Sequence, residues 1–273
     1  MKTIIIIHNL NSRGKNINED YVRELLNKKG MKFHYFQTKQ ISDVDEIIKK
    51  YNNPSEFQYC SIGGDGSLNA LVNSLMKNNI ILPEVSCLPG GSGSDFIRTF
   101  ALPQNIEQAV EHLDYDNFYE VDVGLIKNKT DAKYFINVLN IGFLASTVEV
   151  SEKFPNLFRA FRYPLSFWIK IITARAKEMT ISNDKYEFKG MAFNICVCNA
   201  QYFGGGWNIS PKSSLQDGLF NIQVFAVTKL KAMQIFFLAK KGLHLKESSV
   251  KLKRLSQLTV NSRDPIEIDG DFF

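Results

Sequence analysis

Residues 3–88 alternate between short apolar runs and stretches in which apolar side chains recur every three or four positions. The runs have the length of buried strands, and the stretches between them have the spacing of helices that pack on one face. The strands are expected at residues 3–8, 32–36, 57–62 and 85–88, and the helices at residues 18–29, 44–51 and 68–76. Strands that alternate with helices predict an α/β domain with a parallel, doubly wound sheet.

The pattern changes near residue 118, where strand-like runs follow one another with turn residues between them, such as Asn128 and the pair Asn183-Asp184. Strands are expected at residues 121–126, 134–143, 179–188, 191–199, 219–227, 257–260 and 265–269, with helices only near 163–178 and 229–241. The sequence therefore predicts two domains. Residues 1–118 form the α/β domain, and residues 119–273 form a β-rich, antiparallel, sandwich-like domain.

Composition limits the class of protein. The 273-residue chain is 44% hydrophobic and 22% charged, with a net charge of +5, which is typical of a folded protein and mildly favours an anionic partner. No apolar run approaches the roughly 18 residues of a membrane span, and the N-terminal run is too short for a signal peptide. The four cysteines lack metal-ligand spacing, so reduced thiols in a cytoplasmic protein are expected.

The strongest local signal is the loop Gly63-Gly64-Asp65-Gly66-Ser67, which directly follows an expected strand. Glycines there let the backbone turn sharply and approach a ligand, because no Cβ stands in the way. The helix that follows would direct free N–H groups at the ligand, which suits a phosphate, although glycine turns also occur where they only cap a helix. Asp65 would repel bare phosphate, so a divalent cation or a ribose hydroxyl is expected between them.

A second loop with the same character, residues 90–95, follows the next strand and precedes another helix. Loops from neighbouring strand ends converge outside the carboxyl edge of an open α/β sheet, where such sheets bind ligands. Neither loop is a Walker A P-loop, which requires Gly-Lys-Ser/Thr, and neither is a G-x-G-x-x-G dinucleotide fingerprint. The pair of loops favours a nucleotide site of another kind.

Residues 63–69 resemble the GGDGT-x-N signature of the diacylglycerol kinase catalytic-domain family, a family related to sphingosine kinases and NAD kinases. Further elements that resemble the family follow its order at residues 9–15 (N-P-x-S-G-K), 91–96 (G-T-x-N-D-F), 204–206 (a glycine cluster), 217–219 (D-G-x-L) and 268–271 (D-G-E). The resemblance extends over almost the whole chain. It implies an ATP-dependent lipid kinase that transfers the γ-phosphoryl group to diacylglycerol or a similar neutral lipid alcohol.

The resemblance also implies roles for individual residues. The residues expected to contact ATP are Asn9, Gly14, Thr38, Gly63, Gly64, Asp65, Gly66, Ser67, Asn69, Ser92 and Asp95. It further implies a structural Mg²⁺ site from Ser214, Asp217 and the Leu219 carbonyl. Asp271 is implied as the catalytic base that takes the proton of the attacking lipid hydroxyl, and Asp65 as a catalytic residue acting through Mg²⁺ or the nucleotide.

The chain departs from the family pattern at several of these positions. Ala70 replaces a glutamate, and Ser94 replaces the asparagine of the second element. Ser67 and Ser92 replace threonines, which keeps each hydroxyl. Asp271 replaces the glutamate base and is shorter by one carbon–carbon bond of about 1.5 Å. The chain also ends at Phe273, whereas family members usually continue through further strands.

Partners and location follow from the resemblance. ATP and a lipid alcohol at a membrane surface are the expected partners, a homodimer is compatible with the family, and no nucleic-acid partner is expected. The aromatic and basic segment 154–170 suits either an interfacial surface or a core helix with basic edges, so a cytoplasmic, peripherally membrane-associated enzyme is expected. Two alternatives remain open: a kinase of a soluble acceptor, of the NAD kinase type, and a homologue that binds ATP or lipid with weakened catalysis.

Overall fold

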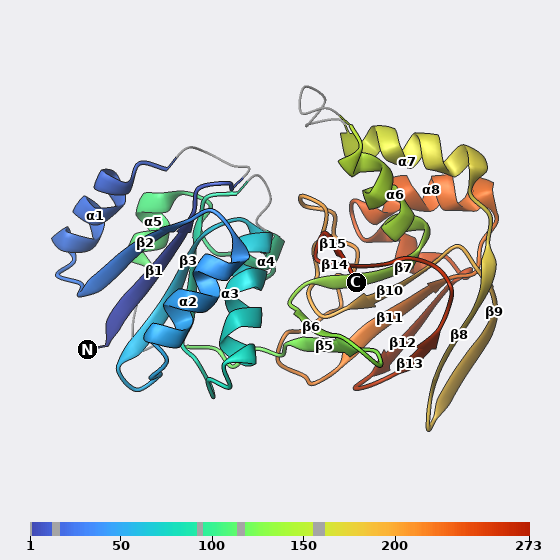
Figure 1. The fold of residues 1–273 in the computed structure, drawn as a ribbon. Helices are drawn as coiled ribbons and strands as arrows, with labels where there is room; N and C mark the ends of the chain where they lie inside the picture. Colours follow the sequence, from blue (N-terminus) through green and yellow to red (C-terminus); the bar gives the residue numbers. More distant parts are fainter. Residues whose placement is uncertain (1, 13–16, 92–94, 114–117, 155–161) are drawn as a thin grey trace. The chain divides into compact units, whose positions relative to one another are not determined.

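The computed structural model describes the chain except residues 1, 13–16, 92–94, 114–117 and 155–161 (Figure 1). The chain divides into two compact units, and each is built on sheets of its own. The N-terminal unit contains residues 1–121 and 125–134, and the C-terminal unit contains residues 122–124 and 135–273.

The N-terminal unit has a four-stranded parallel sheet in the order β2-β1-β3-β4. Its strands are β1 (Thr3–Asn9), β2 (Phe33–Thr38), β3 (Phe57–Gly63) and β4 (Val85–Pro89). The run Ile4 to Ile7 in β1 is buried on both faces of the sheet, as a central parallel strand requires.

Helices cover both faces of this sheet. Ile4 and Ile6 pack with one pair of helices, while Ile5 and Ile7 pack with the other, because successive side chains of a strand point to opposite faces. The first pair is α1 (Glu19–Lys28) and α5 (Ile106–Glu111), and the second is α2 (Ile41–Lys50) and α3 (Asp65–Lys77). The short helix α4 (Asp95–Thr99) follows β4. The predicted doubly wound α/β fold is confirmed.

Antiparallel pairing joins the strands of the C-terminal unit. The larger sheet has the order β12-β11-β10-β7-β14-β15, made of Val250–Leu255, Phe220–Phe225, Asn194–Cys198, Val138–Gly142, Ile266–Ile268 and Asp271–Phe272. A smaller sheet has the order β13-β8-β9, made of Thr259–Asn261, Lys177–Asn183 and Tyr186–Ala192. A separate pair of strands, β5 (Gly124–Lys127) and β6 (Ala132–Phe135), belongs almost entirely to the N-terminal unit. The predicted β-rich antiparallel second half is also confirmed.

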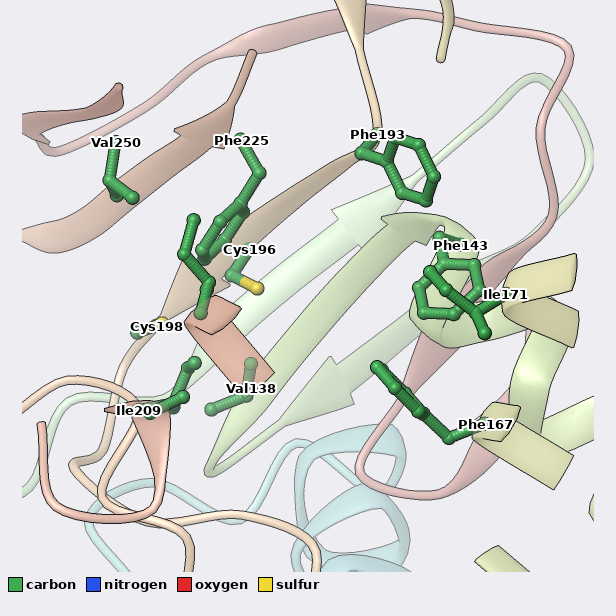
Figure 2. Close-up of a cluster of buried hydrophobic side chains, with 12 residues drawn as sticks. Val138, Phe143, Phe167, Ile171, Phe193, Cys196, Cys198, Ile209, Phe225 and Val250 are labelled. Carbon is green, nitrogen blue, oxygen red and sulfur yellow. The ribbon is translucent and has the colours of Figure 1, made fainter. Parts of the chain in front are cut away.

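Helices α6 (Phe143–Glu152), α7 (Arg162–Thr173) and α8 (Lys229–Ala239) lie together beside the larger sheet, and the 3₁₀ helix η2 (Leu243–Lys246) follows α8 (Figure 1). Between these helices and the sheet lies an aromatic core that includes Phe143, Phe167 and Phe225 (Figure 2). No helix in the described part of the chain is long and apolar enough to cross a membrane.

Part of the C-terminal half differs from the sequence prediction. The single strand expected at residues 134–143 is two strands, β6 and β7, separated at Ile136 and Asn137. Helix α6 then begins directly at Phe143, after Gly142, whose φ of +104° ends the strand. Tertiary pairing decides these elements, so local sequence alone did not identify them.

Candidate functional site

The carboxyl ends of the parallel strands lie at one edge of the N-terminal sheet, and predicted ATP residues are found there. Asn9 ends β1, Thr38 ends β2 and Gly63 ends β3. Chain order reverses between β1 and β3, so this edge contains the switch point at which open α/β sheets bind ligands. The predicted residues Gly14 and Ser92 lie outside the described residues. We call the described part, residues 9–12, 38, 63–67 and 90–91, the nucleotide edge.

Side-chain hydrogen bonds connect the loops of the nucleotide edge. Asn9 Nδ2 donates to Ser67 Oγ across the switch point at 2.9 Å, and Ser12 Oγ donates to the carbonyl of Gly90 at 2.8 Å. Thr38 is buried, and its Oγ1 lies 3.4 Å from the carbonyl of His8. The hydroxyl of Ser67 therefore accepts from Asn9 and keeps its own proton available for a ligand.

At two positions of the nucleotide edge, neighbouring atoms lie so close to the backbone that glycine is required. A Cβ on Gly63 would lie 2.2 Å from Ser67 Oγ, and a Cβ on Gly90 would lie 3.1 Å from the nitrogen of Gly63. The backbones of the two loops are also joined, because Gly90 N–H donates to the Gly63 carbonyl at 2.9 Å. The two glycine loops that the sequence singled out are thus packed on each other.

Helix α3 begins at this edge and presents its amino end to it. Its N-cap is Gly64, whose lack of a side chain leaves the first-turn N–H groups without a side-chain cap. A Cβ on Gly66 would meet nothing within 4 Å, so the space beside it is open. First-turn N–H groups without a side-chain cap, the positive end of a helix dipole and open space together suit an anionic group such as a phosphate.

Asp65 joins the two loops through its carboxylate. Its Oδ2 and Oδ1 accept hydrogen bonds from the backbone N–H groups of Asp95 and Phe96, both at 3.0 Å. The carboxylate therefore caps α4, and Asp95 is itself buried. Contact of Asp65 or Asp95 with Mg²⁺ or the nucleotide stays a prediction, whereas a structural role for Asp65 is visible.

Asn69 is buried in the second turn of α3 and faces the β5–β6 hairpin. Its Nδ2 donates to the carbonyl of Tyr134 at 3.1 Å. Asn73, one turn later, bonds both backbone groups of the same residue: its Oδ1 accepts from Tyr134 N–H at 2.9 Å, and its Nδ2 donates to the Tyr134 carbonyl at 3.0 Å. The signature asparagine thus holds the hairpin strand in place, and its predicted contact with ATP stays a prediction.

The predicted metal residues lie in the loop between β10 and β11. Hydroxyl, carboxylate and carbonyl oxygens are of the kind that Mg²⁺ prefers. However, Asp217 Oδ1 accepts from Leu219 N–H at 2.9 Å, and its Oδ2 is ion-paired with Arg254. No group of three or more His, Cys, Asp or Glu side chains among the described residues could hold a metal ion. With Asp217 balanced by Arg254, the side chains as placed do not fit a divalent cation, and the Ser214–Asp217–Leu219 site stays a prediction.

Asp271 follows a turn that carboxylates hold in the C-terminal unit. Asp269 (φ +50°) and Gly270 (φ +100°) form the turn, and Asp271 is exposed directly after it. The Asp269 carboxylate accepts hydrogen bonds of 2.7–3.0 Å from three successive N–H groups, those of residues 136–138. These bonds explain the break between β6 and β7. We call residues 267–271 the base turn.

Glu267 is a feature of the base turn that sequence reasoning missed. It is only 5% exposed. Its Oε2 accepts from Asn140 Nδ2 at 2.7 Å, and its Oε1 accepts from the N–H of Gly270. Burial raises the pKa of the Glu267 carboxyl to about 7, against the lowering effect of these two hydrogen bonds. One signal in the sequence could have identified Glu267: it is the polar residue of an otherwise apolar strand and lies two residues before an Asp-Gly-Asp turn.

The C-terminal unit also contains an apolar cavity between its larger sheet and its helices. About 60 Å³ of it is open to the centre of a water-sized sphere. Phe143, Phe167, Phe193 and Phe225 line it from the sheet and the helices (Figure 2). Asn194 is the one amide side chain among its described lining residues, and its Nδ2 lies 3.4 Å from Asn140 Oδ1. An apolar lining of this kind suits hydrocarbon groups.

Comparisons with known proteins agree with this arrangement. Residues 3–126 match the family model described as diacylglycerol kinase catalytic domain, and residues 137–272 match the YegS C-terminal NAD kinase beta sandwich-like domain. A protein of Staphylococcus saprophyticus named diacylglycerol kinase is 25% identical over 254 residues, which are 90% of this chain and 81% of that protein. A protein of Escherichia fergusonii named "Probable lipid kinase YegS" is 24% identical over 217 residues, 78% of this chain and 72% of that protein.

The fold is found in solved structures as well. The crystal structure of a diacylglycerol kinase from Bacillus anthracis has a TM-score of 0.73 at 18% identity, and the match covers 100% of this chain and 90% of that one. The similarity therefore includes both units, and the resemblance stated from the sequence motifs is confirmed.

Proposed function

Because this chain belongs to the diacylglycerol kinase-like family of lipid kinases, we propose that it transfers the γ-phosphoryl group of ATP to the hydroxyl of diacylglycerol or a similar neutral lipid alcohol. The observation that supports the proposal is the combination of a helix N-terminus suited to phosphate in one unit with an exposed aspartate on a hydrogen-bonded turn and an apolar-lined cavity in the other.

The nucleotide edge is proposed to bind ATP. The first-turn N–H groups of α3 would bind phosphate oxygens, and the Ser67 hydroxyl would donate one further bond. The hydrogen bonds from Asn9 to Ser67 and from Ser12 to Gly90 hold these groups in place before ATP arrives, which lowers the entropy cost of binding. Mg²⁺ bound to ATP would neutralise phosphate charge.

Asp271 is proposed as the general base. A lipid hydroxyl must lose its proton as it attacks the γ-phosphoryl group, and an exposed carboxylate on a fixed turn can accept it. The shorter side chain relative to glutamate makes placement of the turn more important, because a displacement of about 1 Å can cost on the order of a hundredfold in rate.

The apolar cavity supports a lipid acceptor. Its walls are almost entirely aromatic and aliphatic side chains, with the Asn194 amide at one point. An acyl chain would be bound there by burial of its surface, at about 25 cal/mol for each Å² removed from water. A soluble polar acceptor would gain nothing from these walls.

Exposed side chains on helices α7 and α8 support the proposal that the protein acts at a membrane surface. Leu165, Ile169 and Ile172 are exposed along one face of α7, and Leu230 and Phe237 are exposed on α8. The two helices are in contact, with the rings of Trp168 and Phe237 5.9 Å apart. Exposed basic side chains accompany this apolar face at Arg175, Lys229, Lys240 and Lys241. Apolar side chains among cations suit an anionic lipid surface. Of the aromatic and basic segment 154–170, for which the sequence left an interfacial surface and a core helix both open, residues 155–161 lie outside the described residues.

Transfer of labelled phosphate from ATP to diacylglycerol in mixed micelles tests the proposal. A panel of lipid alcohols and soluble NAD should be offered in parallel. We expect label in the lipid fraction, dependent on the detergent interface, and none in NAD. Label in NAD without any lipid would contradict the lipid assignment, and ATP binding without transfer to any acceptor would indicate a homologue with lost catalysis.

Membrane binding is tested separately by sedimentation with vesicles of phosphatidylglycerol and phosphatidylcholine. The double variant Ile172→Asp, Leu230→Asp is expected to weaken binding about tenfold, because two apolar contacts are replaced by charges of the same sign as the lipid. Ile81→Asp is the matched control, because Ile81 is equally exposed but belongs to the N-terminal unit. Equal loss in both would contradict the α7–α8 assignment.

A further inference from the structure

Glu267 is a buried carboxylate that the proposed mechanism does not use. It lies on β14 directly opposite Asn140 of β7, which in turn lies opposite Cys196 of β10. Among the residues that the structure describes, no lysine, arginine or histidine forms an ion pair with it. An unpaired buried carboxylate is costly, so its retention needs a reason beyond packing.

The hydrogen bonds of Glu267 connect the base turn with β7. Its Oε1 accepts from Gly270 N–H, and its Oε2 accepts from Asn140 Nδ2 at 2.7 Å. Gly270 has a φ of +100° and is the residue that redirects the chain toward Asp271. Asp269 is fixed independently by three N–H groups of residues 136–138. Hydrogen bonds thus hold both residues of the Asp269–Gly270 peptide. They fix the backbone from which Asp271, the next residue, extends.

We propose that Glu267 is a positioning residue for Asp271, acting through the N–H of Gly270. The proposal rests on the proposed function, in which Asp271 is the base. Glu267 is too deeply buried to contact a substrate itself, and its two oxygens are engaged by Gly270 of the turn and by Asn140 of β7. Its side chain determines the direction in which the shorter aspartate reaches its acceptor.

The ionisation of Glu267 gives the proposal a measurable consequence. An ionised carboxylate can accept both bonds, whereas a protonated one carries an O–H at one oxygen and must lose or rearrange one of them. The groups that face it are the carboxylates of Asp269 and Asp271, which oppose its ionisation, the Asn140 amide, and the Cys196 thiol, whose pKa burial raises well above its usual range. Since burial places the pKa of Glu267 at about 7, the hydrogen bond between its carboxylate and the N–H of Gly270 changes near neutral pH.

Nuclear magnetic resonance can observe this contact without any turnover. The sequence contains three Asp-Gly peptides, at Gly66, Gly218 and Gly270. Labelling aspartate with carbonyl ¹³C and glycine with ¹⁵N therefore selects these three amides. We expect the Gly270 amide to titrate with a midpoint near pH 7 in the wild type and to lose that step in Glu267→Gln. A Gly270 amide that is unchanged across this range in the wild type, or that titrates equally in Glu267→Gln, would overturn the proposal.

Kinetics then test the effect on Asp271. We expect Glu267→Gln to lower kcat about ten- to a hundredfold with an unchanged KM for ATP, and to remove the step near pH 7 from the kcat profile. Glu267→Asp should recover part of the pH step, because it restores a carboxylate at shorter reach. Glu247→Gln, which alters a surface ion pair with Lys231, is the control and should change neither quantity.

The two experiments fail in different ways. If no lipid alcohol is phosphorylated but Gly270 titrates as expected, the proposed function is wrong and the Glu267–Gly270 contact stands. If the wild type phosphorylates lipid and Glu267→Gln has the same kcat and the same pH profile, the positioning role is wrong and the proposed function stands.

Discussion

The nucleotide edge and the base turn solve the same problem, the exact placement of a few atoms, by different means. The nucleotide edge relies on backbone: glycines that allow loops to touch, and the free amino end of α3. The base turn relies on carboxylates: Asp269 bonds three N–H groups, and Glu267 bonds a fourth from inside the sheet.

This difference predicts different sensitivities. A backbone-built site fails when a Cβ is added, and its strength varies little with pH. A turn held by carboxylates tolerates changes in side-chain size better, but its stability depends on the charge of those carboxylates. The predictions below separate the two kinds of failure, beginning with the largest expected effect.

Gly63→Ala should destabilise the N-terminal unit by about 3 kcal/mol, because the new Cβ would lie 2.2 Å from Ser67 Oγ. Thermal unfolding measures this loss. Gly66→Ala is the matched control: its Cβ meets nothing within 4 Å, so stability should hold, while ATP affinity falls because the methyl group occupies the proposed phosphate position. Equal melting temperatures for wild type and Gly63→Ala would contradict a backbone-built edge.

Asp269→Ala should cost about 3 kcal/mol in unfolding free energy, since three N–H groups lose a charged acceptor at once. Denaturant unfolding provides the measurement. Asp131→Ala, which removes an exposed turn carboxylate bonded to Thr130, should change stability by less than about 0.5 kcal/mol. Similar small losses in both variants would show that the amides of residues 136–138 do not depend on the carboxylate.

Glu267→Gln should change the pH dependence of stability. The folded pKa of about 7 lies above the ordinary value of 4.5, so between these values the folded state keeps a proton that the unfolded state releases. Wild-type stability therefore falls as pH rises through this window, by at most about 3 kcal/mol. The glutamine variant lacks this loss. Its stability relative to that of the wild type should therefore increase as the pH rises to about 7. Parallel stability curves would contradict the raised pKa.

Asn9→Ala should weaken ATP binding several-fold and cost about 1 kcal/mol in stability, because it removes the 2.9 Å bond to Ser67. Calorimetry with a non-hydrolysable ATP analogue measures the affinity. Asn11→Ala removes a hydrogen bond to the Lys39 carbonyl in the same loop and should leave ATP affinity unchanged. If both variants bind the analogue as the wild type does, the link across the switch point is not needed.

The sequence predicted the nucleotide edge better than the base turn, for a physical reason. Glycine loops after buried strands are local signals, and parallel pairing necessarily brings Asn9, Thr38 and Gly63 to one edge. Asp269 and Glu267 also bond to residues 136–138 and 140, respectively, which lie more than 120 positions away along the chain. Asn69 shows the same limit, because its signature position did not reveal its bond to Tyr134.

The central claim is that the two regions have separable roles, ATP binding at the nucleotide edge and proton removal by Asp271. Asp271→Asn tests it most directly, with ATP affinity and lipid phosphorylation measured on the same preparation. We expect unchanged ATP affinity and a loss of phosphorylation of at least about a hundredfold. Phosphorylation at the wild-type rate, or a parallel loss of ATP binding, would contradict the account.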